Sequence, residues 1–153
     1  MNAGELGRYL HTHIPLSAAM RVEVLEASRE RVRLSAPLAP NINHRGTVFG
    51  GSAAALATLA AWALLHLRLS AEGFAGRIVI RRSHMDFEKP IAGAFEARAE
   101  APDEPRWRRF RATLARGRPA RIEMRAVLTF GGAKVGAFTG EFVALPGLGD
   151  DGG

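Results

Sequence analysis

The residues best suited to chemistry lie together between Asn41 and Ser52. This segment holds two carboxamides, one imidazole, three glycines and two hydroxyls, and a long apolar stretch follows it directly. Glycines let the backbone approach a ligand closely, and the first amides of a helix have no acceptor within that helix. A helix that begins near Gly50 would therefore offer free N–H groups to a developing negative charge, as an oxyanion hole does. A simpler interpretation also fits, in which a glycine-rich turn is capped by Thr47 or Ser52 and only lets the helix pack closely.

The apolar stretch itself predicts a long helix from about Gly50 to just before Gly73, because it is rich in alanine. Residues 48–67 carry no charge and match the length of a membrane-spanning helix. Alanine and glycine contribute little to membrane insertion, however, and polar residues such as Thr58 and His66 interrupt the run. We therefore expect no membrane span but a helix that the protein itself surrounds.

Alternation of polar and apolar residues predicts strands on both sides of this helix. Two strands precede it, over 20–26 and 31–38, and the short connection between them requires antiparallel pairing. The four runs that follow it are 77–87, 93–101, 120–130 and 134–145.

Two shorter helices complete the pattern. Residues 5–13 form one helix that Pro15 ends, and residues 104–116 form an amphipathic helix with Asp103 as its N-cap. Antiparallel strands with a helix against one face are an α+β architecture, which argues against a doubly wound nucleotide-binding fold. We expect a single domain over residues 1–146 and a disordered glycine-rich tail over 147–153.

The composition excludes several kinds of site. The 153 residues include no cysteine, so disulfides, thiolate nucleophiles and zinc sites with cysteine ligands are excluded. The five histidines have no metal-ligand spacing, and we expect neither a metal nor another cofactor. The N-terminal residues lack the apolar core of a secretory signal, so we expect a cytoplasmic protein.

The loop before the helix resembles that of the hotdog-fold thioesterases, in which an antiparallel sheet wraps a central helix. The family's loop carries an Asn, then Gly-Thr, then His-Gly-Gly at the start of the helix. Matching residues stand at the same spacing in this chain: Asn43, Gly46, Thr47, Gly50 and Gly51. The likeness spans residues 14–145 and looks closest to the thioesterase domain at the C-terminus of some bacterial acetyltransferase-like proteins. It implies a hotdog fold of about six strands, a homodimer or dimer of dimers, and sites at the subunit interface.

Two positions depart from the family's pattern. Phe49 replaces the usual histidine before the glycines, where it could contact substrate, and Thr58 replaces the acidic residue of the helix. No carboxylate lies between residues 50 and 69, which excludes direct attack by a carboxylate of the helix.

Hydrolysis by water is the mechanism that remains. The amides of Gly50 and Gly51 would polarise a thioester carbonyl, while Asn43 and Thr58 position the attacking water. A threonine hydroxyl is not a strong base at neutral pH, so the reaction needs another base or is slow.

Candidates for the missing base are few. His44 lies in the loop itself, and an imidazole exchanges protons readily near neutral pH, although loop histidines are often simply solvated. His84 and Asp86 lie two residues apart on one strand and share a face, so they could form a polarised pair. Ser83 points the opposite way and could contact the substrate instead.

Arginine dominates the positive charge, with 19 arginines, 2 lysines and a net charge of +6. Eight of these arginines fall within residues 106–125, where only Glu123 opposes them. They could form an ordinary solvated surface, or they could bind the phosphates of coenzyme A or an acidic acyl carrier protein, with Arg116 and Arg118 as candidate contacts. Nucleic acid binding is disfavoured, because Trp107 and Phe110 have the spacing of core residues.

The resemblance and the loop chemistry together favour a thioesterase that hydrolyses an acyl-CoA or an acyl-carrier-protein thioester. The main alternative is a non-catalytic module that binds acyl-CoA or docks a partner and has lost the carboxylate. A dehydratase on the same fold is a third possibility, disfavoured because no histidine and acid pair occupies the helix.

Overall fold

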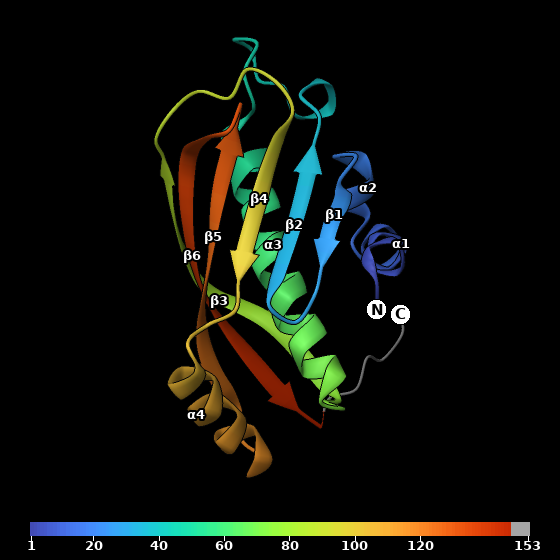
Figure 1. The fold of residues 1–153 in the computed structure, drawn as a ribbon, viewed down its shortest axis with the longest axis vertical. Coiled ribbons are helices and arrows are strands. Elements are labelled where there is room, and N and C mark those ends of the chain that lie inside the picture. Colours follow the sequence, from blue (N-terminus) through green and yellow to red (C-terminus); the bar gives the residue numbers. More distant parts are fainter. Residues whose placement is uncertain (148–153) are drawn as a thin grey trace.

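One antiparallel sheet of six strands curls around a long helix in the computed structural model, which describes residues 1–147 (Figure 1). The strands are β1 (Glu23–Ala27), β2 (Arg31–Ala36), β3 (Gly76–Phe87), β4 (Phe95–Glu100), β5 (Ala120–Phe130) and β6 (Ala133–Pro146). They lie in the order β1-β2-β4-β5-β6-β3, and every neighbouring pair is antiparallel. The α+β class and the hotdog fold expected from the sequence are confirmed.

The helices differ in role and in place. They are α1 (Ala3–His13), α2 (Pro15–Ala19), α3 (Gly50–Ala71), α4 (Glu104–Ala115) and the short 3-10 helix η1 (Ala39–Asn41). α3 lies inside the curled sheet, and α1 and α2 lie beside β1 (Figure 1). α4 lies at the lower end of the sheet, in the connection that leads from β4 to β5 (Figure 1). Of the predicted tail over residues 147–153, only Gly147 lies within the described residues.

Burial by the sheet explains the apolar character of α3. Among the described helices it alone is long and apolar enough to cross a membrane, but 67% of its apolar window is buried inside the protein. Its small side chains, such as Ala57 and Ala60, let the strands approach closely, while Leu56 and Leu64 fill the space between. α3 is therefore the core helix of a hotdog fold, as the sequence predicts.

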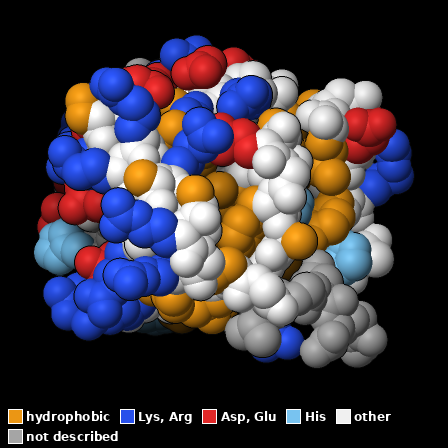
Figure 2. Space-filling view, turned by 90° about the horizontal axis from the view of Figure 1, so that it is seen from below, with side chains coloured by type: hydrophobic (Ala, Val, Ile, Leu, Met, Phe, Trp, Pro, Cys, Tyr) orange, Lys and Arg blue, Asp and Glu red, His pale blue; other side chains and the backbone are white. Residues whose placement is uncertain are grey.

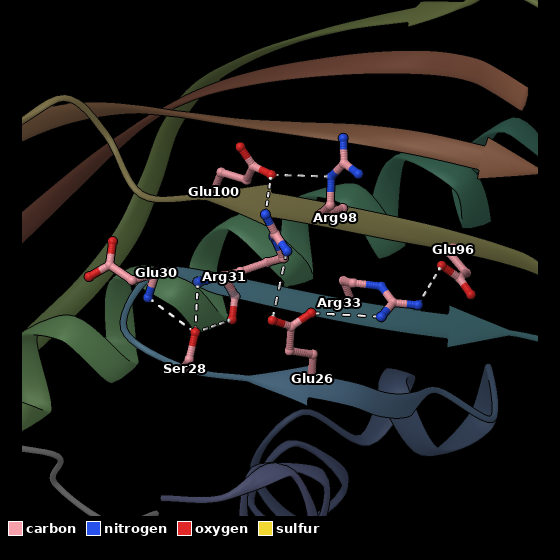
Figure 3. Close-up of polar contacts among 8 residues, drawn as sticks. All are labelled: Glu26, Ser28, Glu30, Arg31, Arg33, Glu96, Arg98 and Glu100. Atoms are coloured by element: carbon pink, nitrogen blue, oxygen red, sulfur yellow. Dashed lines mark hydrogen bonds and ion pairs between the residues drawn. The ribbon is translucent and has the colours of Figure 1, made fainter. Parts of the chain in front are cut away.

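The sheet has an apolar inner face and a charged outer face. On β5 the buried residues Ile122, Met124 and Ala126 alternate with charged ones that face outward. On the outer face Arg31 bridges Glu26 and Glu100, and so links the first three strands of the sheet order (Figure 3). Ion pairs therefore cover the side of the sheet that faces away from α3.

The start of the chain differs from the sequence prediction. Pro15 not only ends α1 but also opens α2, as its fixed φ and missing N–H allow at the first position of a helix. The chain then turns at Met20 and Arg21. Arg21 has a φ of 57°, and among the described residues other than glycine it alone has a positive φ. β1 therefore begins at Glu23 and not at residue 20.

β3 is an edge strand, and its exposure is unusual. It pairs with β6 along one side only, and most of its residues are exposed, including the apolar Val79, Ile80 and Phe87. A bulge between Ile80 and Arg82 shifts the alternation of its side chains by one residue. A long exposed edge of this kind is open to pairing with another strand.

Candidate active site

Asn43 organises the loop that leads into α3. Its Oδ1 accepts hydrogen bonds from the amides of Arg45 (2.8 Å) and Thr47 (3.1 Å), and its Nδ2 donates to Oγ1 of Thr47 (2.8 Å). Gly46 takes a φ of 81° between them, a value that glycine adopts at little cost. Both acceptor positions of the Asn43 oxygen are therefore used, and one N–H of its amide remains to donate to a ligand.

The first amides of α3 are open. The N-cap is Phe49, whose side chain makes no capping hydrogen bond, so neither Thr47 nor Ser52 caps the helix. The carbonyl of Phe49 accepts from the amides of Ser52 and Ala53, whereas those of Gly50 and Gly51 have no acceptor within residues 1–147. Two adjacent backbone donors at the positive end of the helix dipole can stabilise an oxyanion.

Two phenylalanines flank these donors. Phe49 and Phe87 are 58% and 60% exposed, and both lie against the glycines. A Cβ at Gly50 would stand 3.4 Å from the Phe87 ring, in ordinary contact, but a Cβ at Gly51 would collide with the Phe49 ring. Glycine at position 51 therefore lets Phe49 pack over the helix start.

Thr58 lies on a partly exposed stripe of α3 that begins at these donors. Gly51, Ala55, Thr58 and Trp62 follow one another at helical spacing, and the sheet leaves them partly uncovered. The hydroxyl of Thr58 donates to the carbonyl of Ala54 at 2.8 Å. Its proton is thereby used, and only its lone pairs remain to accept a hydrogen bond from a water.

An apolar pocket of about 290 Å³ opens along this stripe. Its lining comes from the α1–α2 segment, α3, β3 and β6: Ile14, Leu16, Ser17, Met20, Ala55, Thr58, Leu59, Trp62, Ile80 and Phe142. This volume lies near the lower limit for small-molecule sites. Thr58 and Ser17 are its polar side chains, and the hydroxyl of Ser17 is bound to the carbonyl of Ile14, so the pocket suits an apolar chain.

Comparison with known proteins gives the family. The family model described as "Putative thioesterase (yiiD_Cterm)" matches residues 3–146. The chain belongs to this thioesterase family. The sequence resemblance to hotdog thioesterases is therefore confirmed.

Solved structures share this fold, and two of the three given below are described as thioesterases. A protein from Shewanella oneidensis described as a "putative thioesterase" is 30% identical, with a TM-score of 0.84 over 94% of this chain and 97% of its own. A protein of unknown function from Chlorobaculum tepidum is 28% identical, with a TM-score of 0.89 over 94% of each chain. A "Probable Thioesterase" from Pseudomonas aeruginosa is 25% identical, with a TM-score of 0.78 over 94% and 95%.

The candidate bases of this thioesterase-family chain do not meet at the helix start. His44 is exposed at the loop tip, and its Nε2 faces Nε of Arg45 at 3.3 Å. His84 and Asp86 do form a pair, with Nε2 and Oδ1 3.0 Å apart, but both are mostly exposed. Their partners in the register, Thr139 and Ala137, belong to the outer face of β6, so the pair points away from α3.

Ser83 lies on the other side of the same strand. It pairs with Gly140 in the register, between the inward-facing Phe138 and Phe142, and so lies on the face of β3 opposite to His84 and Asp86, toward α3. Its hydroxyl is exposed and has no hydrogen bond within the described chain. Ser83 is thus the β3 residue that remains available to a substrate on α3.

Arg116 and Arg118 are exposed at the end of α4, beyond the lower end of the sheet. The Asn43 loop lies at the upper end (Figure 1). α3 separates the two ends, and its 22 residues span about 33 Å. One chain does not bring these arginines to the helix start.

Asn41 is a site residue that the sequence prediction missed. It is buried, its Nδ2 donates to the carbonyls of Met20 (3.0 Å) and Pro37 (2.8 Å), and its own carbonyl accepts the amide of Phe49 (2.7 Å). It therefore joins the wall of the apolar pocket to the residue that starts α3. The sequence signal was that the loop contains two asparagines, Asn41 and Asn43. The sequence alone does not reveal which of the two is buried.

Proposed function

We propose that the protein hydrolyses acyl thioesters of coenzyme A or of an acyl carrier protein in the cytoplasm, by attack of water. The observation that carries the proposal is the pair of open amides at Gly50 and Gly51, from which a stripe of α3 leads into an apolar pocket. Membership in a thioesterase family supports the reaction class. The pocket supports an apolar acyl group.

Each group has a defined part in the proposed step. The thioester carbonyl oxygen accepts from the amides of Gly50 and Gly51, and the remaining N–H of Asn43 donates to the same oxygen or to the water. Thr58 lies seven residues, or about 10 Å, along α3 from Gly51, so the Thr58 whose lone pairs accept a hydrogen bond from that water would belong to the second subunit of a dimer. The oxygen of the water bonds to the carbonyl carbon, and the carbon–sulfur bond breaks. The thiolate leaves and takes up the proton lost by the water. Because the Asn43 oxygen is saturated by the loop, Asn43 acts as a donor and not as a base.

A homodimer would complete the site. β3 is a long edge with exposed apolar side chains, and pairing with a second copy of itself would cover it. A two-fold axis perpendicular to the sheet makes this pairing antiparallel and keeps both α3 helices on the same face. Ser83, Phe87 and the partly exposed stripe of α3 would then lie at the subunit interface.

A non-catalytic acyl-binding module is the second candidate. It is favoured by one observation, namely that the first carboxylate after Gly50 is Glu72, at the far end of α3, where it pairs with Arg29 and Arg111. No carboxylate of α3 can therefore act as a base near the open amides.

Thiol release from a panel of acyl-CoAs tests the reaction. We expect hydrolysis by the wild type, a loss of about 100-fold in kcat/KM for Asn43→Ala and about 10-fold for Thr58→Ala. Thr113→Ala is the matched control, because the Thr113 hydroxyl makes the same bond within α4, to the carbonyl of Arg109 at 3.1 Å.

The outcomes separate the candidates. Tight acyl-CoA binding without hydrolysis of any CoA or carrier thioester would establish the binding module instead. Hydrolysis that Asn43→Ala leaves unchanged would refute this site and leave the fold and family untouched.

A further inference from the structure

We propose that the end of the molecule formed by α4 and the start of β5 docks an acidic protein that carries the acyl thioester. This inference rests on the thioesterase function proposed above and names the kind of carrier. The arginine surface that carries it comprises Arg108, Arg109, Arg116, Arg118 and Arg121. All five are exposed, and none has an ion pair among residues 1–147.

The neighbouring arginines are paired, which sets this surface apart. Arg106 pairs with Asp103 (2.6 Å) and Arg125 with Glu123 (2.9 Å). Arg111 pairs with Glu72 (2.6 Å). Asp103, Glu123 and Glu72 are therefore already engaged, and Glu104 in the first turn of α4 is the local carboxylate without an ion pair among residues 1–147. The five remaining guanidinium groups have no ion pair within these residues.

Five unpaired cations of one sign repel one another, and that repulsion opposes folding. An anionic partner would remove it and gain charge-assisted hydrogen bonds. Figure 2, which looks at this end of the molecule, shows Lys and Arg side chains gathered on one side of it. The planar fork of arginine binds a carboxylate through two parallel hydrogen bonds, so acidic side chains fit this surface.

A hollow of about 470 Å³ between α4 and β5 adds shape to the charge. Exposed Arg109 and Arg121 line it together with the buried Phe110 and Ile122. Glu123 also lines it, and its carboxylate is paired there with Arg106 at 3.7 Å. An acidic side chain from a partner can enter it and meet a guanidinium group. The hollow makes this a better docking surface than a flat cluster of the same charge.

An acidic protein fits better than a nucleic acid or a membrane. Trp107 and Phe110 are 2% and 3% exposed, so the surface offers no aromatic ring on which a base can stack. No large exposed hydrophobic residue belongs to α4 or to the start of β5, so nothing there can insert into a bilayer.

The proposed dimer relates this surface to the reaction. In one chain, α4 and the Asn43 loop lie at opposite ends of α3 (Figure 1). Antiparallel pairing of two β3 strands inverts the second copy, so the α4 of one subunit lies at the same end as the loop of the other. A carrier docked on one subunit would then present its flexible arm to the site of the second subunit.

The test compares one acyl group on two carriers, a holo acyl carrier protein and coenzyme A. The variants are Arg108→Glu, Arg109→Glu and Arg121→Glu. The control is Arg8→Glu, because Arg8 is exposed on α1, has no ion pair in the described chain, and changes the net charge equally. Circular dichroism and thermal unfolding verify that each variant folds.

We expect each surface variant to raise KM for the acyl carrier protein by about 3- to 10-fold and to leave acyl-CoA hydrolysis within about twofold of wild type. Salt should lower kcat/KM for the carrier more steeply than for acyl-CoA. Arg8→Glu should behave as wild type with both substrates.

Several results would overturn the inference. An unchanged KM for the carrier in all three variants would do so, as would an equal loss with both substrates, which would mean that the arginines bind phosphates of coenzyme A. Loss of oligoribonucleotide binding, measured by fluorescence anisotropy, with unchanged carrier kinetics would assign the surface to RNA. Wild type that hydrolyses only CoA thioesters would refute the docking but not the thioesterase function, whereas hydrolysis of neither substrate would refute that function itself.

Discussion

The two ends of α3 satisfy their polar groups in opposite ways. At the N-terminal end the side chains are bound within the loop while two backbone amides stay open. At the C-terminal end Arg68 is buried and donates to the carbonyl of Arg29. The exposed arginines of the nearby arginine surface, in contrast, have no ion pair among residues 1–147. Open backbone donors are fixed in place and suit a transition state, whereas open side chains are mobile and suit a partner surface.

The largest expected effect concerns Arg68, the buried cation at the C-terminal end. Its Nη1 donates to the carbonyl of Arg29 (2.6 Å) and lies 3.8 Å from a carboxylate oxygen of Glu30. Its guanidinium lies 4.3 Å from the centre of the Trp107 ring, and its Nε has no hydrogen-bond partner among residues 1–147. We expect Arg68→Ala to lower the free energy of unfolding by about 3 kcal/mol, since it removes this packing. Arg68→Met should cost less than about 1 kcal/mol, since it keeps the volume and removes a buried charge. Urea unfolding measures both, and equal losses would mean that the polar contacts carry the energy.

Gly51→Ala should act at the other end, on activity. The new Cβ would displace the Phe49 ring, so we expect kcat/KM to fall about 10-fold. Gly50→Ala is the matched comparison, since its Cβ meets Phe87 at an ordinary 3.4 Å, and a smaller loss of about threefold is expected. Equal losses at the two positions would show that the Phe49 contact is unimportant.

Trp62→Ala should change which substrates are preferred. Trp62 lines the apolar pocket, and its indole Nε1 donates to the carbonyl of Ile78 at 3.2 Å. Removing the ring lengthens the pocket, so the preferred acyl chain should become longer. Each extra buried methylene is worth about 0.8 kcal/mol, or roughly fourfold in kcat/KM. An unchanged chain-length profile would place the acyl group elsewhere.

The smallest expected effect concerns the N-cap of α4. A hydrogen bond from the amide of Arg106, with the Arg106 side chain beside it, lowers the pKa of Asp103 below its ordinary value of 3.8. The resulting stability is present above that value and is lost as the pH falls through the lowered pKa. Asp103→Asn keeps the cap acceptor without the charge, so its melting temperature should depend less on pH below about 4 than that of wild type. Thermal unfolding followed by circular dichroism between pH 2 and 7 measures the difference, and parallel profiles would contradict it.

The fold could be predicted from the sequence because its periodicities are strong. The bounds of β5 match those expected, and α3 begins at the residue predicted. α2 was missed because Pro15 both ends one helix and starts the next, which the proline alone does not reveal. The start of β1 moved for the same reason.

The site was predicted less completely, because its functions depend on contacts across the fold. The sequence indicates that the glycines of the loop precede a helix, but not that the Asn43 oxygen is saturated by two amides. It indicates that His84 and Asp86 share a face, but not which face. That depends on pairing with β6, which a local pattern does not contain.

The bulge in β3 determines which of its side chains face α3. Ile78 and Ile80 face α3, and a regular strand would continue with Arg82, His84 and Asp86 on the same side. Arg81 is the extra residue of the bulge and has no paired residue in the register with β6, so the alternation shifts by one residue. Ser83 and Phe87 therefore face the helix. Loss of the bulge, with the same residues in a regular strand, would turn these faces over and place the imidazole and carboxylate of His84 and Asp86 beside α3 in place of Ser83 and Phe87.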